Sequence, residues 1–253
     1  MKTIRGAFTL VELLVVIAVI AILAALLLPV LARAKATAWK AGCINNQRQL
    51  VIASFVYATD HADYMPNNGR QSPPTKLNSF WVQGVFVNPP DNTNTAYLFD
   101  PNYALLADQI HSIGTYVCPA DRDWVKVLPG TTQYPKIRSY ELNAYVGWNG
   151  AWDYRLNAGY KIFRKQTDFA TALMPASVFL FTDVNPDSIC WPFFGVMMNS
   201  DYFFNFPLSS HNHGGIQSYA DGHAEYHKWT DPRTIAGFSL HYHMHHESSL
   251  ANA

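Results

Sequence analysis

The sequence predicts an α+β protein in which one long amino-terminal helix packs on an antiparallel β-sheet domain with long loops. Three observations support this fold class. An apolar run follows a short basic start, helical spacing continues to about residue 58, and short strand-like segments separated by Pro, Asn and Gly follow from about residue 60. A chain of 253 residues is long enough for one sizeable domain with an appendage.

The apolar run is long enough to cross a membrane. Every residue from Leu13 to Leu28 is Leu, Val, Ile or Ala, and a span of about 20 apolar residues crosses the hydrocarbon core as a helix. A secretory signal peptide would have a shorter apolar region, of about 7 to 15 residues. A plain anchor leaves Glu12 unexplained, because a carboxylate in a bilayer is costly and usually has a partner or a function. Pro29 is expected to kink the helix without ending it.

The helix is expected to continue beyond the membrane. Its apolar positions recur at spacings of three and four residues, which predicts one face that packs on a domain. These positions are Cys43, Ile44, Leu50, Val51, Ser54, Phe55 and Ala58. From Phe8 to Ala58 a helix is about 75 Å long, more than any bilayer requires. Asp60 and the following HADYMPNNG contain the polar and turn-forming residues that end it.

The remainder is predicted to form short strands. The best candidates are FWVQGVFV at 80–87, GTYVC at 114–118, SVFLFTDV at 177–184, and the pair IQSYA and HAEYH. The last pair flanks Asp221-Gly222, which predicts a hairpin with a two-residue type I′ turn. YALLADQI at 103–110 is a candidate short helix, and the segments PNNGRQSPPTKLNS and NPPDNTNT are expected to be long loops.

Composition argues against nucleic-acid binding and does not identify an enzyme. The chain has 18 basic and 18 acidic side chains and no net charge, so no global field attracts it to nucleic acid. Phosphate-binding glycine motifs, HExxH and GxSxG are missing from the sequence. Aromatic segments such as GWNGAWDY have the chemistry to stack on sugar rings, although burial beneath the loops is the favoured interpretation.

Histidines near the carboxyl terminus raise the question of a metal site. The candidate ligands are His211, His213, His223 and His227 with Asp183 and Asp221. The turn better explains Asp221, and His223 and His227 fit the solvent side of a strand. The tail HYHMHHE at 241–247 would bind transition metals in vitro, but a solvated tail is favoured. We therefore expect neither a metal nor a cofactor.

Three cysteines, Cys43, Cys118 and Cys190, match neither a dense disulfide scaffold nor a CxxC metal site. Cys43 and Cys118 are the most plausible disulfide, because one is on the helix and the other ends a strand that has the position to pack beside it. Two buried thiols remain an equal alternative.

The amino terminus, GAFTLVELLVVIAVIAILAALLLPV, closely resembles the class III signal of type IV pilins and type II secretion pseudopilins. In that family a basic leader ends at a small residue and precedes FTLxE and an apolar helix. The resemblance implies cleavage on the cytoplasmic side by prepilin peptidase and N-methylation of the new terminus. Counted from Phe8, Glu12 is fifth and Pro29 twenty-second, as in the family. Cleavage after Ala7 keeps this register and is favoured. The family usually has Gly immediately before the cut, so cleavage after Gly6 is the alternative.

The resemblance also implies an organisation and a function. Residues 1–7 would be the leader, 8–59 a pilin-like helix with its membrane span at about 8–31, and 60–253 a periplasmic or surface domain of a single-pass protein of the bacterial inner membrane. The chain would be a structural subunit of a type II secretion pseudopilus or type IV pilus-like filament. Its partners would be membrane lipid, prepilin peptidase, the assembly platform and other subunits. Glu12 would pair with the positive amino terminus of a neighbouring subunit. The alternative is a tethered solute- or glycan-binding protein that uses the signal only as an anchor.

A second resemblance concerns the carboxyl-terminal part. His211, nine intervening residues and Asp221-Gly222 in HNHGGIQSYADGH resemble the H-X9-DG signature of large prepilin-like proteins, the DUF1559 group. CINNQRQL, YVCPAD, SYELNAY and PASVFLFTD fit the same group with less specificity. The function of that group is poorly defined, so this resemblance implies assembly and no particular ligand.

Overall fold

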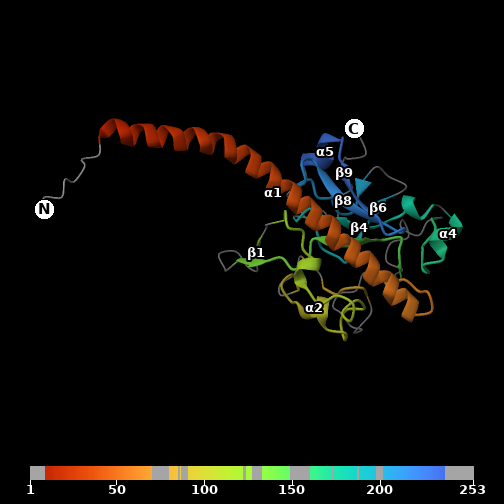
Figure 1. Cartoon of the computed structure of the whole chain (residues 1–253). Coiled ribbons are helices and arrows are strands. Elements are labelled where there is room, and N and C mark those ends of the chain that lie inside the picture. Colours follow the sequence, from red (N-terminus) through yellow and green to blue (C-terminus); the bar gives the residue numbers. More distant parts are fainter. Residues whose placement is uncertain are drawn as a thin grey trace. The chain divides into compact units, whose positions relative to one another are not determined.

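The computed structural model describes residues 9–69, 80–84, 86, 91–121, 124–126, 133–148, 160–172, 174–186, 188–197 and 202–236. The chain forms two compact units, Met1–Trp39 and Lys40–Ala253. Helix α1, Leu10–Asp60, contributes its first part to one unit and its last part to the other. It continues through Pro29 and ends where predicted, followed by Ala62 and Asp63 at positive φ. The α+β prediction is confirmed (Figure 1).

The second unit contains a five-stranded sheet with strand order β5-β3-β4-β8-β9. The strands are β3 Tyr140–Asn143, β4 Phe179–Asp183, β5 Phe193–Phe194, β8 Gly214–Tyr219 and β9 Ala224–Lys228. The pairs β3-β4, β4-β8 and β8-β9 are antiparallel, as expected. Strand β5 runs parallel to β3, so the sheet is mixed.

The second unit also contains several short elements. Two further pairs of strands are antiparallel: β1 Trp124–Lys126 with β2 Gln133–Pro135, and β6 Val196–Met197 with β7 Tyr202–Phe203. The short helices are α2 Ala96–Phe99, η1 Ile113–Thr115, α4 Asp168–Ala172, η2 Pro175–Ser177 and α5 Pro232–Ala236.

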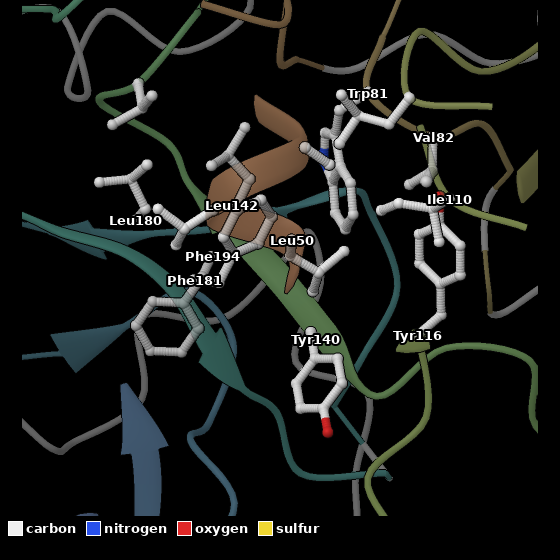
Figure 2. Packing of buried hydrophobic residues seen from close by; sticks show 14 of the residues in the cluster. Leu50, Trp81, Val82, Ile110, Tyr116, Tyr140, Leu142, Leu180, Phe181 and Phe194 are labelled. Atoms are coloured by element: carbon white, nitrogen blue, oxygen red, sulfur yellow. The ribbon is translucent and has the colours of Figure 1, made fainter. Parts of the chain in front are cut away.

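The part of α1 within the second unit supplies one wall of the main core. Its buried residues are Cys43, Gln47, Leu50, Val51, Ala53, Ser54, Tyr57 and Ala58, which confirms the predicted helical spacing. Leu50 lies among the side chains of Leu142, Phe181 and Trp81 (Figure 2). The Gln47 amide nitrogen Nε2 donates a hydrogen bond of 2.9 Å to the carbonyl of Ile216 in β8. The helix is therefore joined to the sheet by apolar packing and by a buried hydrogen bond.

Two strand predictions were wrong. Segment 114–118 begins in the 3-10 helix η1, because the carbonyls of Ser112 and Ile113 accept hydrogen bonds from the N–H groups three residues later. In the described part of 80–87, Phe80 forms only an isolated bridge to Ala104. Segment 103–110 forms turns instead of the expected short helix. The expected loop at 66–79 lies largely outside the described residues, whereas residues 91–95 of the expected loop at 88–95 are described and lie in turns.

The β8-β9 hairpin is confirmed, but its turn differs from the prediction. The loop has three residues, Ala220, Asp221 and Gly222, and the Tyr219 N–H donates a 2.9 Å hydrogen bond to the His223 carbonyl. Only Gly222 has a positive φ, of 92°, whereas type I′ needs positive φ at two residues. The Gly222 N–H donates to the Tyr219 carbonyl, so a three-residue loop with a left-handed glycine closes the hairpin.

Candidate functional site

The described part of the amino-terminal signal begins with a reciprocal helix cap. The backbone N–H and the hydroxyl of Thr9 donate hydrogen bonds of 2.8 and 2.7 Å to Glu12 Oε2. The Glu12 N–H donates in return to Thr9 Oγ1 at 3.3 Å. This is a capping box, in which a Thr before the helix and a Glu three residues later satisfy two orphan backbone donors. The TLVE signature for this cap was visible in the sequence and was not used in our interpretation of Glu12.

The apolar part of α1 is uncovered. Its large hydrophobic side chains from Leu10 to Leu31 are 47–77% exposed. By length and composition this helix is able to cross a membrane. The expected processing residues Gly6, Ala7 and Phe8 lie outside the described residues, so their role stays a prediction.

The two ends of the H-X9-DG motif lie in different environments. His211 precedes β8 and is buried, with 5% of its surface exposed. Asp221 is exposed in the hairpin loop, where its Oδ1 accepts a 3.0 Å hydrogen bond from the His223 N–H and contacts His223 Nδ1. The turn therefore accounts for Asp221 and Gly222, as expected. His211 belongs to a separate site.

That site is a buried cluster of Cys43, Cys118, Asp183 and His211. Cys43 is on α1, Cys118 follows η1, Asp183 ends β4, and His211 lies in the turn before β8. His211 Nε2 is 3.2 Å from each of the two sulfurs and 3.6 Å from Asp183 Oδ2. One ligand atom from each residue lies within 4.8 Å of all the others.

Neighbouring groups hold the cluster in place. Both carboxylate oxygens of Asp183 accept a hydrogen bond of 3.0 Å from the Ile216 N–H. The Tyr140 hydroxyl donates to Cys43 Sγ at 3.3 Å. A Cβ at Gly215 would lie 2.4 Å from Asp183 Oδ1, so only glycine allows β8 to approach this carboxylate so closely. The glycine at position 215 therefore has a structural reason.

Burial dominates the electrostatics of the cluster. It raises the pKa of the Cys118 thiol, and it raises the pKa of Asp183 to about 7 although the nearby His211 opposes this shift. Burial also disfavours the charged form of His211, but its hydrogen bond to Cys118 and the charges of Cys118 and Asp183 raise the pKa of His211 overall. Burial and the charges of close neighbours therefore set the pKa values of Cys118, Asp183 and His211.

The sequence indicates only part of this site. His211 and Asp183 were expected as candidate ligands, and Cys43 and Cys118 either as a disulfide or as two buried thiols. The two cysteines are free thiols in this structure, and their bonding stays a prediction. His213 and His227 are exposed. Among the described residues only these four form a group of metal-ligating side chains, and the tail at 241–247 lies outside those residues.

A second buried polar group consists of Glu141 on β3, Arg138 just before β3, and Asn205. Asn205 Nδ2 donates hydrogen bonds to Glu141 Oε2 and to the Phe193 carbonyl. Arg138 Nη2 donates to the Trp191 carbonyl at 3.0 Å. Burial raises the pKa of Glu141 to about 8, and the charge of Arg138 only partly offsets this effect. Burial likewise lowers the pKa of Arg138 to about 10.

The described aromatic residue of the candidate sugar-binding segment GWNGAWDY is a core residue. Trp148 is 2% exposed and packs in a small cluster with Tyr145, Cys190, Trp191 and Phe193. The preferred interpretation, burial beneath the loops, is confirmed for Trp148, while Trp152 lies outside the described residues.

Comparison with known proteins identifies the amino terminus alone. A family model described as the prokaryotic N-terminal methylation motif matches residues 3–28. Neither a curated protein nor a solved structure matches the chain. The H-X9-DG resemblance is not tested by these comparisons and stays a prediction. The match, the capping Glu12 and the uncovered apolar helix agree: this chain carries a prepilin-like signal of the type IV pilin family.

Proposed function

We propose that this protein is a prepilin-like structural subunit of a type II secretion pseudopilus or a type IV pilus-like filament. Prepilin peptidase cleaves its leader and methylates the new terminus, and the apolar helix then holds it in the bacterial inner membrane. The second unit extends into the periplasm or onto the cell surface. The observation that carries this proposal is the methylation motif at residues 3–28, which leads directly into an uncovered apolar helix.

The exposed helix supports assembly with other subunits. Side chains that are 47–77% exposed over Leu10–Leu31 can be covered by lipid before assembly and by neighbouring helices afterwards. The same surface would thus serve as an anchor and as an interface.

Glu12 has two separable roles in this proposal. Within the subunit its carboxylate caps α1 through Thr9, as the hydrogen bonds show. Between subunits its negative charge would pair with the positive amino terminus of a neighbour, which gives a charge in an apolar environment its partner. Glutamine also serves in a capping box, so Glu12→Gln removes the charge and keeps the cap.

The test compares Glu12→Gln with Thr9→Ala in a host that contains the peptidase and the assembly machinery. Filament content is measured after shearing and by crosslinking, and mass spectrometry of the amino terminus verifies processing of each variant. We expect Glu12→Gln to be processed and to remain unassembled. Thr9→Ala weakens the cap by about 1 kcal/mol but keeps the charge, so it should still assemble.

Three outcomes would count against the proposal. An intact leader in the wild-type chain would exclude prepilin processing. Equal filament content for wild type and Glu12→Gln would exclude the charge as an assembly group. A processed wild-type chain that stays monomeric in the complete system would favour the tethered binding protein. The same spectra locate the cut, which we expect after Ala7 and not after Gly6.

A further inference from the structure

We propose that Cys43, Cys118, Asp183 and His211 bind one Zn²⁺ ion as a structural site that joins α1 to the sheet. This inference rests on the second unit alone and is independent of the proposed assembly function. The four side chains come from four separate segments, and up to 168 positions separate them along the chain. Their convergence is therefore a product of the tertiary fold.

The spacing of the ligand atoms fits a tetrahedral ion. Zinc bonds of about 2.3 Å to sulfur and about 2.0–2.2 Å to nitrogen or oxygen place tetrahedral ligands about 3.4–3.8 Å apart. His211 Nε2 is 3.2 Å from the sulfurs of Cys43 and Cys118 and 3.6 Å from Asp183 Oδ2. All pairs of ligand atoms lie within 4.8 Å, so side-chain shifts of up to about 1 Å bring the four to tetrahedral spacing.

Hydrogen bonding alone satisfies this cluster poorly. His211 Nε2 faces three ligand atoms but has either one proton to donate or one lone pair to accept. At most one of these three contacts is then a good hydrogen bond from the imidazole. A central cation interacts favourably with all four groups at once, which removes the cost of leaving buried polar atoms poorly paired.

The donor set selects zinc and a structural role. Two sulfurs with imidazole and carboxylate are ligands that zinc accepts, and four protein ligands leave no position for water or substrate. All four residues are buried, with exposed fractions of 0–5%. A closed, buried, four-coordinate site stabilises a fold and has no open position for catalysis.

The surroundings supply the supporting contacts that metal ligands usually have. The Ile216 N–H holds the Asp183 carboxylate, and the Tyr140 hydroxyl donates to Cys43 Sγ, where it would stabilise a thiolate. The Asn46 amide in turn contacts the Tyr140 hydroxyl at 3.4 Å. These contacts orient ligands from α1 and from β4 toward the same point.

The first test is performed on the full chain in detergent, with the tail histidines His241, His243, His245 and His246 replaced by alanine to remove competing binding. The protein is refolded under reducing conditions with Zn²⁺ or Co²⁺ and then dialysed. We expect one retained metal ion per chain, and with Co²⁺ a sulfur-to-cobalt charge-transfer band together with the intense visible bands of tetrahedral cobalt. If the reduced protein with all four ligand residues intact shows none of these cobalt bands, the proposal is overturned.

Variants then assign the ligands. Cys118→Ser and His211→Ala should each lower metal retention at least tenfold, and Cys118→Ser should also weaken the charge-transfer band. Cys190→Ser is the matched control and should retain the metal. Cys190 is equally buried but lies in the hydrophobic cluster that contains Trp148 and Trp191. Equal retention by all these variants would overturn the assignment.

A disulfide is the competing outcome. Protein purified without reductant is alkylated, digested and analysed by mass spectrometry. A Cys43–Cys118 linked peptide in protein that contains no zinc would overturn the proposal in favour of the disulfide. Two alkylatable thiols released only after the metal is chelated would support the zinc site.

Discussion

The buried carboxyl group of Glu141 predicts that the protein becomes less stable between pH 4.5 and pH 8. Burial raises the pKa of Glu141 from its ordinary 4.5 to about 8 in the folded state. As the pH rises through this window, the unfolded chain releases the Glu141 proton while the folded chain keeps it. Unfolding is therefore favoured increasingly, with a limiting slope of about 1.4 kcal/mol per pH unit.

The contribution of Glu141 is isolated by comparison with Glu141→Gln. Glutamine keeps an oxygen that accepts the Asn205 hydrogen bond but has no proton to titrate. The full chain in nonionic detergent is unfolded with urea at pH 5, 6 and 7 and followed by Trp fluorescence. Between pH 5 and 7 the free energy of unfolding of wild type should fall by up to about 3 kcal/mol more than that of the variant.

The difference between the two proteins is the decisive quantity. Asp183, whose pKa burial also raises, titrates in both chains, so its effect cancels. Parallel pH profiles for wild type and Glu141→Gln would refute the reasoning. Such a result would mean that Arg138 keeps Glu141 ionised in the core.

Three further predictions concern the core, the hairpin and the cluster. Leu50→Ala should lower the free energy of unfolding by about 3 kcal/mol in urea titrations, because Leu50 is fully buried, whereas Ile52→Ala at a 60% exposed position should change it little. Gly222→Ala should cost about 1 kcal/mol in the same assay, because φ is +92° although no atom lies within 4 Å of the added Cβ. Tyr140→Phe should weaken zinc binding about tenfold in a chelator competition, because Cys43 loses its hydrogen-bond donor. An unchanged zinc affinity would show that the Tyr140 hydroxyl does not support the ligand Cys43.

Periodicity predicted the parts of the fold that local sequence controls. Spacings of three and four residues identified the buried face of α1, and alternation on both sides of a glycine turn identified β8 and β9. Segment 114–118 has strand-like residues, yet it begins with the turn of a 3-10 helix because its backbone bonds locally and not to a neighbouring strand. Strand β5 has only two residues, too few for any periodic pattern.

The candidate site shows a different limit. Glu12 and Thr9 are three residues apart, so their capping box was available from sequence alone. Cys43 and Cys118 have no such spacing, and no local pattern relates them to Asp183 or His211. Their grouping depends on how α1 packs against β4 and β8, which is tertiary information.

The hydrogen bonds of Ile216 have a mechanical consequence. Its carbonyl accepts from Gln47 on α1, and its N–H donates to Asp183 at the end of β4. Strand β8 lies inside the sheet, with β4 on one side and β9 on the other. A pulling force applied along the last part of α1 therefore reaches an interior strand that two ladders of hydrogen bonds hold, and peeling an edge strand does not relieve it.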